Sequence, residues 1–167
     1  MPDFRILSPV PNSTTKNSVI REIRAGNNME NALIEKIQSY FLNENEVVAV
    51  YLFGSYALGK ARRTSDVDIG ILLNSNNSKL FKAKQLRYLK ELGRLLRKDI
   101  HPVILNTAGE MLMQQIFTKG KCIVDNDQQK HAQFRMVMFS RIAAFSDYKK
   151  QMQAGLIKNI MGGAAVG

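Results

Sequence analysis

Two hydrophobic periodicities alternate along the chain, and together they predict a sheet whose strands are joined by helices. Apolar runs within residues 46–53 and 66–73 predict two strands, and the first is apolar enough to be a central strand covered on both faces. Residues 100–105 predict a third strand, which we expect at an edge because Pro102 lacks an N–H donor. Residues 122–124 predict a short final strand.

Apolar residues at three- and four-residue spacing predict helices. The helix expected over residues 28–41 has an apolar face made of Leu33, Ile34, Ile37, Tyr40 and Phe41. The helix expected over residues 80–98 has a basic back and an apolar face made of Phe81, Leu86, Leu89, Leu92 and Leu96. Thr107 and Glu110 have the spacing of a capping box that opens another helix, and Gly120 is suited to end it.

A last helix is expected from Gln129 onward, and it carries two apolar lines. One line is Phe134, Met138, Ile142, Tyr148 and Met152, and the other is Met136, Phe139 and Ala143. A helix with two apolar faces has two neighbours, so either both faces are buried within this chain or one meets another chain. We expect fraying from Met161 onward, a solvated His131 and a buried Cys122 thiol.

Length and composition indicate one folded domain with short appendages. The chain has 167 residues, of which 45% are hydrophobic and 23% are charged, and these values exclude general disorder and several independent modules. We expect a flexible arm over residues 1–27 with room for a short helix. A core domain should span residues 28–127, and a C-terminal amphipathic helix with a frayed tail should span residues 128–167.

Three further features bear on location. The single cysteine cannot form an internal disulfide, and no run approaches the roughly 20 apolar residues that span a bilayer. No signal-peptide pattern is visible at the N-terminus. We therefore expect a cytoplasmic protein that makes no use of a membrane.

The net charge of +10 is concentrated in two segments. Residues 79–99 carry eight basic and two acidic side chains, and residues 126–167 carry six and two. Such surfaces attract a nucleoside triphosphate, an acidic protein or RNA, although basic side chains on a helix also serve solubility alone. No array of aromatic residues accompanies the basic ones, so RNA binding rests on charge alone.

The turn between the two long strands has residues suited to phosphate binding. Gly54 allows a sharp bend where the first strand ends, and Ser55 then offers a hydroxyl and an N–H group to a phosphate oxygen. Gly59 permits a second tight turn, and Ser65 can bond to the adjacent backbone and steady the segment.

A pair of carboxylates follows this turn. Asp66 and Asp68 stand two residues apart at the start of a strand, so both should leave the same face with their Cα atoms roughly 7 Å apart. Oxygen ligands placed in this way suit Mg²⁺, which is commonly held by carboxylates together with substrate phosphates.

The segment from Gly54 to Asp68 resembles the signature of the DNA polymerase β-like nucleotidyltransferase superfamily, and most of all its minimal nucleotidyltransferase (MNT) group. Residues 100–108 and 116–125 are similar to the third catalytic strand and the following helix–strand unit of that group, so the resemblance covers about residues 28–127. It implies an α/β (α+β) fold with a small mixed sheet and helices packed on one side. The C-terminal helix is additional to that fold.

The resemblance also implies metal-dependent transfer of a nucleoside monophosphate from a triphosphate. Asp66 and Asp68 are then the ligands of Mg²⁺ or Mn²⁺. The candidate nucleotide-binding residues are Gly54, Ser55, Ser65, Lys60 and Arg62.

One position departs from the family pattern in a way that affects the chemistry. His101 aligns with the position where the family has a third carboxylate. Asp99 lies two residues earlier and should face the same side of its strand, so it is a candidate substitute. His101 is itself a candidate general base.

A small protein that resembles the MNT group is expected to be the antitoxin of a HEPN/MNT toxin–antitoxin pair. It would transfer AMP from ATP to a tyrosine of a HEPN ribonuclease toxin. The alternatives are neutralisation of the toxin by binding alone, nucleotidyl transfer to a small molecule of the aminoglycoside type, and direct action on RNA. The sequence leaves open whether the chain forms a homo-oligomer.

Overall fold

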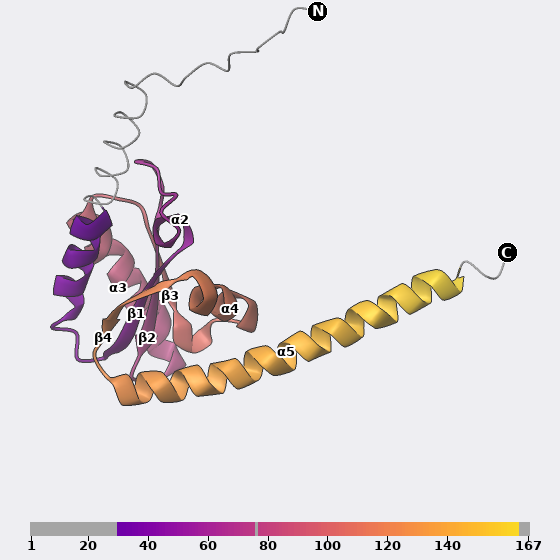
Figure 1. Cartoon of the computed structure of the whole chain (residues 1–167). Helices are drawn as coiled ribbons and strands as arrows, with labels where there is room; N and C mark the ends of the chain where they lie inside the picture. Colours follow the sequence, from indigo (N-terminus) through magenta and orange to yellow (C-terminus); the bar gives the residue numbers. More distant parts are fainter. Residues whose placement is uncertain (1–29, 76, 164–167) are drawn as a thin grey trace, which may run out of the picture.

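The computed structural model describes residues 30–75 and 77–163, with side chains up to residue 154. The expected arm over residues 1–27 lies outside the described residues. Figure 1 shows a compact body around a sheet, from which the C-terminal helix extends. None of the described helices is long and apolar enough to cross a membrane.

A four-stranded mixed sheet forms the centre of the molecule, with strand order β3-β2-β1-β4. The strands are β1 (Val47–Phe53), β2 (Val67–Leu73), β3 (Ile100–Ile104) and β4 (Lys121–Asp125). β1 pairs antiparallel with β2 and with β4, whereas β2 and β3 are parallel. All seven residues of β1 are buried, so the predicted central strand is confirmed. Pro102 lies in an edge strand, as its missing donor requires.

One face of the sheet is covered by the helix over residues 30–41 and by α3 (Ser78–Leu96). The first helix buries Leu33, Ile37 and Phe41, which confirms its predicted apolar face. α3 begins at Asn77, whose side chain accepts a hydrogen bond from the Lys79 N–H. The parallel pairing of β2 and β3 needs a crossover of this kind, and α3 supplies it.

The buried stripe of α3 differs from the predicted one. Phe81, Tyr88 and Leu92 are buried against the sheet, while Leu86 is 50% exposed and Leu89 is 41% exposed. Positions 81, 88 and 92 fit the helical repeat as well as Leu86 and Leu89 do, so the spacing alone does not distinguish the two stripes. The stripe is rotated toward Tyr88, whose ring packs against Phe41 at a centroid distance of 5.5 Å.

This rotation leads to a stability test. Leu92 is fully buried, so Leu92→Ala is expected to lower the free energy of unfolding by roughly 2–5 kcal/mol. Leu86→Ala removes the same atoms from an exposed position and should change it by less than about 0.5 kcal/mol. Urea denaturation of the two variants measures the difference. Equal losses would contradict the orientation of α3.

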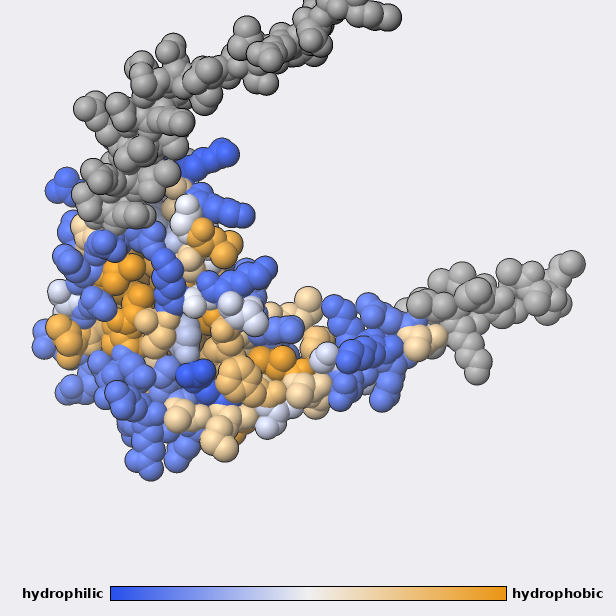
Figure 2. All heavy atoms as spheres, viewed as in Figure 1, coloured by the Kyte–Doolittle hydropathy of each residue, from blue (hydrophilic) through white to orange (hydrophobic). Residues whose placement is uncertain are grey.

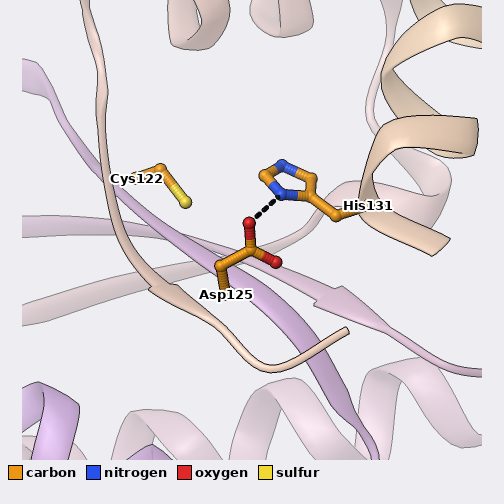
Figure 3. Close-up of side chains that lie close together, drawn as sticks. All are labelled: Cys122, Asp125 and His131. Carbon is orange, nitrogen blue, oxygen red and sulfur yellow. Dashed lines mark hydrogen bonds and ion pairs between the residues drawn. The ribbon is translucent and has the colours of Figure 1, made fainter. Parts of the chain in front are cut away.

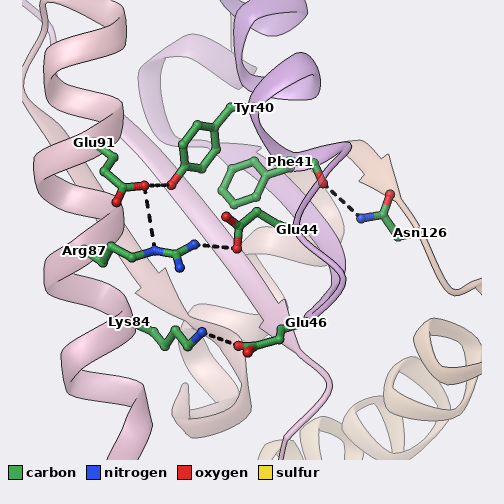
Figure 4. A network of polar contacts seen from close by, with 8 residues as sticks. All are labelled: Tyr40, Phe41, Glu44, Glu46, Lys84, Arg87, Glu91 and Asn126. Atoms are coloured by element: carbon green, nitrogen blue, oxygen red, sulfur yellow. Dashed lines mark hydrogen bonds and ion pairs between the residues drawn. The ribbon is translucent and has the colours of Figure 1, made fainter.

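A network of polar contacts holds α3 to the segment that leads into β1 (Figure 4). Lys84 pairs with Glu46, and this contact keeps the pKa of the Glu46 carboxyl below its usual range. Arg87 pairs with Glu44 and Tyr40 donates to Glu91, so α3 is joined to both ends of the turn after the first helix. The basic side of α3 therefore has a structural role in addition to its charge.

The other face of the sheet is also covered, which corrects the expectation of helices on one side. α4 (Glu110–Lys119) and the first turns of α5 (Gln128–Gly163) pack there through Met113, Ile116 and Met138. The continuous burial of β1 requires this second layer, because an antiparallel strand with one open face alternates polar and apolar residues. The fold class itself, a small mixed sheet with helices, is as predicted.

The start of α4 differs from the predicted capping box. A short 3₁₀ turn, η1 (Leu105–Thr107), precedes it, and Gly109 is the N-cap residue without a side-chain bond. The Thr107 hydroxyl donates to the Ile104 carbonyl at 3.2 Å. Glu110 accepts from Arg141 of α5 and so links the two helices. Gly120 ends α4 as predicted.

α5 is anchored at its beginning and extends away from the body (Figure 1). Its anchor is the first part of the predicted apolar line, Phe134, Met138 and Ile142. Tyr148 and Met152 on the same line are 60% and 51% exposed. The second line is exposed as well, at Met136 and Phe139, and Figure 2 shows apolar side chains along the first half of the helix. The helix continues through Met161 to Gly163, where fraying was expected, and residues 164–167 lie outside the described residues.

Candidate active site

The end of β1 approaches the start of β2 unusually closely. Phe53 pairs with Asp68 in the sheet, and the next residue, Gly54, has a φ of +68°. A Cβ atom placed on Gly54 would lie 2.0 Å from Oδ2 of Asp68. Position 54 therefore requires glycine for two reasons. The positive φ strains any residue with a Cβ, and the Asp68 carboxylate occupies the space that a Cβ would need.

The segment after Gly54 forms a tight turn. α2 (Gly54–Ala57) is one helical turn, and the Ser55 carbonyl accepts from the Lys60 N–H at 2.9 Å. Gly59 has a φ of +65° with nothing within 4 Å of its added Cβ, so it is needed for conformation alone. Tyr56 is buried in the core below the turn.

A second set of hydrogen bonds holds the segment that leads into β2. The Ser65 hydroxyl accepts from the Arg62 N–H at 2.8 Å, and the Ser65 N–H donates to the Arg62 carbonyl at 3.0 Å. Lys98 Nζ donates to the Arg63 carbonyl at 2.9 Å. The expected bond between Ser65 and the neighbouring backbone is therefore present. Its nucleotide-binding role stays a prediction, as do those of Lys60 and Arg62, which are exposed.

The two carboxylates have different surroundings. Asp68 lies in β2 with its side chain 26% exposed, whereas Asp66 is exposed and lies one residue before the strand begins. The expected placement of Asp66 on the same side as Asp68 stays a prediction, because Asp66 is outside the strand. Asp68 faces the layer of α4 and α5, because it pairs with Phe53, whose side chain packs there.

His101 meets Asp68 from the neighbouring strand. The two residues are direct partners in the parallel register of β2 and β3, and Nδ1 of His101 lies 3.3 Å from Oδ1 of Asp68. The imidazole is 68% exposed, so its far edge is open to solvent and to a substrate. Gly54, Asp68 and His101 thus come together at one end of three adjacent strands.

Asp99 is placed differently. Its carbonyl accepts from the Val67 N–H at 2.9 Å, which pins the start of β3 to the start of β2. Its remaining surroundings are a basic cavity of about 320 Å³ lined also by Arg63, Arg97 and Lys98. No side-chain contact joins Asp99 to Asp68 or His101 among the described residues. Its role as a substitute carboxylate stays a prediction.

The donor set at this end of the sheet fits a hard divalent cation that is held jointly with phosphate. Asp66 and Asp68 offer carboxylate oxygens, and the Cα of Gly54 leaves one side of the Asp68 carboxylate free of side-chain atoms. Among the residues that the structure describes, three potentially ligating side chains meet at Cys122, Asp125 and His131 and not at this turn. A cation held by Asp66 and Asp68 would take its remaining oxygen ligands from substrate and water.

Comparison with known proteins identifies the family. Residues 35–129 match the family described as polymerase beta, nucleotidyltransferase. The chain belongs to this family of nucleotidyltransferases. The predicted superfamily and class of enzyme are therefore confirmed.

Individual relatives and solved structures show which nucleotidyltransferases this chain resembles. The protein adenylyltransferase MntA of Shewanella oneidensis is 27% identical over 135 residues, which cover 74% of this chain and 91% of the relative. A crystal structure of a toxin–antitoxin complex with AMP-PNP contains a chain that is 23% identical, with a TM-score of 0.58 and coverage of 77% and 98%. A structure of tri-AMPylated Shewanella oneidensis HEPN toxin with MNT antitoxin gives 22% identity, a TM-score of 0.51 and coverage of 81% and 98%. The predicted resemblance to the MNT group is confirmed, and the two structures show the likeness in fold.

Two features of the site were not predicted from sequence. One is the contact between the Asp68 carboxylate and the Gly54 backbone, for which the sequence shows only a glycine after a strand. The other is the basic cavity beside Asp99, which combines Arg63 with Arg97 and Lys98 from the turn after α3. The excess of basic residues over positions 79–99 indicated a basic surface, but it did not show that Arg97 and Lys98 would line a cavity beside Asp99.

Proposed function

We propose that this chain is the antitoxin of a HEPN/MNT pair and transfers AMP from ATP to a tyrosine hydroxyl of a HEPN ribonuclease toxin. The observation that carries the proposal is the meeting of Gly54, Asp68 and His101 at one end of the sheet. The adenylyltransferase relative named MntA supports adenylate as the transferred group. The AMPylated HEPN toxin in a complex of similar fold supports the acceptor.

The phosphates of ATP are assigned to the turn after β1. The backbone of Gly54 and Ser55 holds the β- and γ-phosphates, and Lys60 and Arg62 offset their charge. Asp66 and Asp68 hold Mg²⁺ or Mn²⁺. When bound, such a cation neutralises charge on the phosphates as the bond to the leaving group breaks.

His101 is assigned to the acceptor. The tyrosine oxygen forms a bond to the α-phosphorus of ATP, the bond from that phosphorus to the bridging oxygen breaks, and pyrophosphate leaves. The hydroxyl proton passes to Nε2 of His101, because Nδ1 faces Asp68. A hydrogen bond from Nδ1–H to Asp68 keeps Nε2 available as the acceptor.

A mass measurement tests the proposal. The chain is incubated with ATP, Mg²⁺ and the protein encoded by the adjacent open reading frame, and the intact mass of that protein is recorded. We expect a gain of one or more AMP groups that depends on Mg²⁺ or Mn²⁺. A folded partner that binds the chain and keeps its original mass would contradict the proposal.

Neutralisation by contact is the second candidate. It is favoured by one observation, the apolar surface of α5 that the described residues leave exposed at Met136, Phe139 and Tyr148. In that case His101 marks a site that no longer transfers nucleotides. Complex formation with an unmodified partner that has lost its ribonuclease activity would support this second function.

Substitution separates the candidate general base, His101, from the candidate substitute carboxylate, Asp99. His101→Ala is expected to lower the rate of AMP transfer by roughly 10²- to 10⁴-fold, as for the loss of a general base. Asp99→Asn should lower it by less than about tenfold, because no described contact joins its side chain to Asp68. Initial rates at saturating ATP provide the comparison. A larger loss for Asp99→Asn would show that Asp99 serves as the third carboxylate and would contradict the assignment of the reaction to His101.

The proposal extends to organisation and location. The nucleotidyltransferase unit is assigned to residues 28–127, preceded by an arm over residues 1–27 and followed by the helical segment over residues 128–167. The chain is assigned to the cytoplasm, where ATP and a ribonuclease target are both present.

A further inference from the structure

A second group of chemically active side chains lies at the opposite edge of the sheet from His101. Cys122 and Asp125 come from β4, and His131 comes from the first turns of α5. Their ligating atoms lie within 4.8 Å of one another, and Figure 3 shows the sulfur, the carboxylate and the ring facing a common point. Both sequence expectations for these residues were wrong, since Cys122 is exposed and His131 is buried.

An irregularity in the sheet brings the two β4 residues together. Residues 122 and 125 are an odd number of positions apart, so a regular strand would direct them to opposite faces. The register with β1 shifts by one residue between the pairs Val50–Val124 and Tyr51–Cys122. This bulge turns Cys122 and Asp125 to the same face, the one on which Tyr51 and α5 pack.

The imidazole of His131 is held at both nitrogen atoms. Nδ1 lies 2.9 Å from Oδ2 of Asp125, and Nε2 lies 2.6 Å from the hydroxyl of the buried Tyr51. The side chain is 6% exposed, and its ring packs edge-on against Tyr51. Neither nitrogen is free to take a proton from Cys122, so the group is unsuited to act as a cysteine nucleophile with its base.

We propose that Cys122, Asp125 and His131 bind a zinc ion. Thiolate, imidazole and carboxylate are the three protein donors that Zn²⁺ prefers, and a water molecule completes four-coordination. With Nδ1 as the ligand, Nε2 keeps its proton and donates it to the Tyr51 hydroxyl, just as the second ring nitrogen of a zinc-bound histidine donates to a neighbouring acceptor. The ion replaces the hydrogen bond between Nδ1 and Asp125.

The geometry allows this with small side-chain movements. Ligand atoms around a tetrahedral zinc ion lie roughly 3.4 to 3.7 Å apart, given its usual bond lengths. The distance of up to 4.8 Å between ligand atoms has to shrink by about 1 Å. Cys122 and Asp125 are both exposed, and the one printed contact of the Cys122 sulfur is a long hydrogen bond to the Val124 carbonyl at 3.4 Å. Their exposure also gives the ion a path from solvent. Once bound, it ties the start of α5 to β4.

Cobalt replaces zinc as a spectroscopic probe. The background is the Asp66→Asn, Asp68→Asn variant, which removes the other carboxylate site from the measurement. Because the chain has one cysteine, a thiolate-to-cobalt charge-transfer band in the near ultraviolet reports Cys122 alone. We expect the band to saturate at one ion per chain and to disappear when Zn²⁺ is added. Cys122→Ser should abolish it.

The remaining ligands are tested by affinity. Asp125→Asn and His131→Gln should weaken cobalt binding at least tenfold, and Tyr51→Phe should weaken it by about 10- to 100-fold. Asp127→Asn is the matched control, since it removes a carboxylate two residues from Asp125 that is outside the cluster, and it should leave the affinity unchanged. If His131→Gln does not fold, the cobalt affinity of Asp125→Asn tests the proposal, because Asp125 is exposed and its substitution should preserve the fold. No band in the folded protein, or unchanged affinity in Asp125→Asn, overturns the proposal.

Discussion

Replacing Asp66 and Asp68 together by Asn is expected to lower AMP transfer by roughly 10³-fold or more. The two carboxylates are the proposed cation ligands at the turn to which we assign the phosphates, and an amide carries no charge to hold a divalent cation there. Asn keeps the size of Asp, and Asp66 is exposed, so the fold should be preserved. Transfer of radiolabel from ATP to the partner protein measures the loss.

Asp147→Asn is the matched control for this experiment. It removes an exposed carboxylate from α5, far along the chain from the turn, and should leave transfer unchanged. Thermal unfolding of both variants checks that the double substitution acts on the site. A double variant that keeps more than a tenth of the activity would contradict the assignment of Asp66 and Asp68.

Gly54→Ala is expected to lower transfer by roughly 100-fold or more, the scale on which misplaced catalytic groups act. The added Cβ would lie 2.0 Å from Oδ2 of Asp68, so either the carboxylate or the turn has to move. The backbone φ of +68° adds strain of about 1–2 kcal/mol for any residue with a Cβ. Both activity and stability should therefore fall.

Gly59→Ala separates these two effects. Its φ of +65° imposes the same backbone strain, but its Cβ meets nothing within 4 Å. It should therefore lose stability of about 1–2 kcal/mol while keeping most of its activity. Urea denaturation and initial rates on both variants give the comparison. If Gly54→Ala and Gly59→Ala lose activity equally, close approach to Asp68 is not what the site requires.

The sheet was predictable because its central strands are buried on both faces. Such strands are continuous apolar runs, and the run in β1 can be seen without knowledge of its neighbours. The edge position of β3 followed from one residue, Pro102. The second helical layer was implied by the same run in β1, although the family resemblance suggested that helices lie on one side.

The helices were predictable in position but not in rotation. α3 has leucines on more than one side, and periodicity alone does not indicate which side meets the sheet. The polar partners decide it, because Lys84 and Arg87 reach the turn before β1 and orient Tyr88 inward. These partners are about 40 residues away in sequence, so no local pattern contains them.

The site was predictable where its residues are close in sequence. The spacing of Gly54, Asp66 and Asp68 predicts a phosphate and metal site, which stays a prediction, and the parallel register places His101 beside Asp68. The group of Cys122 and His131 was missed, because a one-residue bulge in β4 reverses the side on which Cys122 lies relative to Asp125. Sequence alternation gives the wrong face in that case.

The central claim is that neutralisation is covalent and depends on the carboxylates at the turn. The direct test is to co-express the partner protein with this chain or with its Asp66→Asn, Asp68→Asn variant, and to examine the partner by tandem mass spectrometry. We expect AMP on a tyrosine of the partner and normal growth with the unmodified chain. The variant should give an unmodified partner and arrested growth. Normal growth with an unmodified partner in the presence of the variant would contradict the claim.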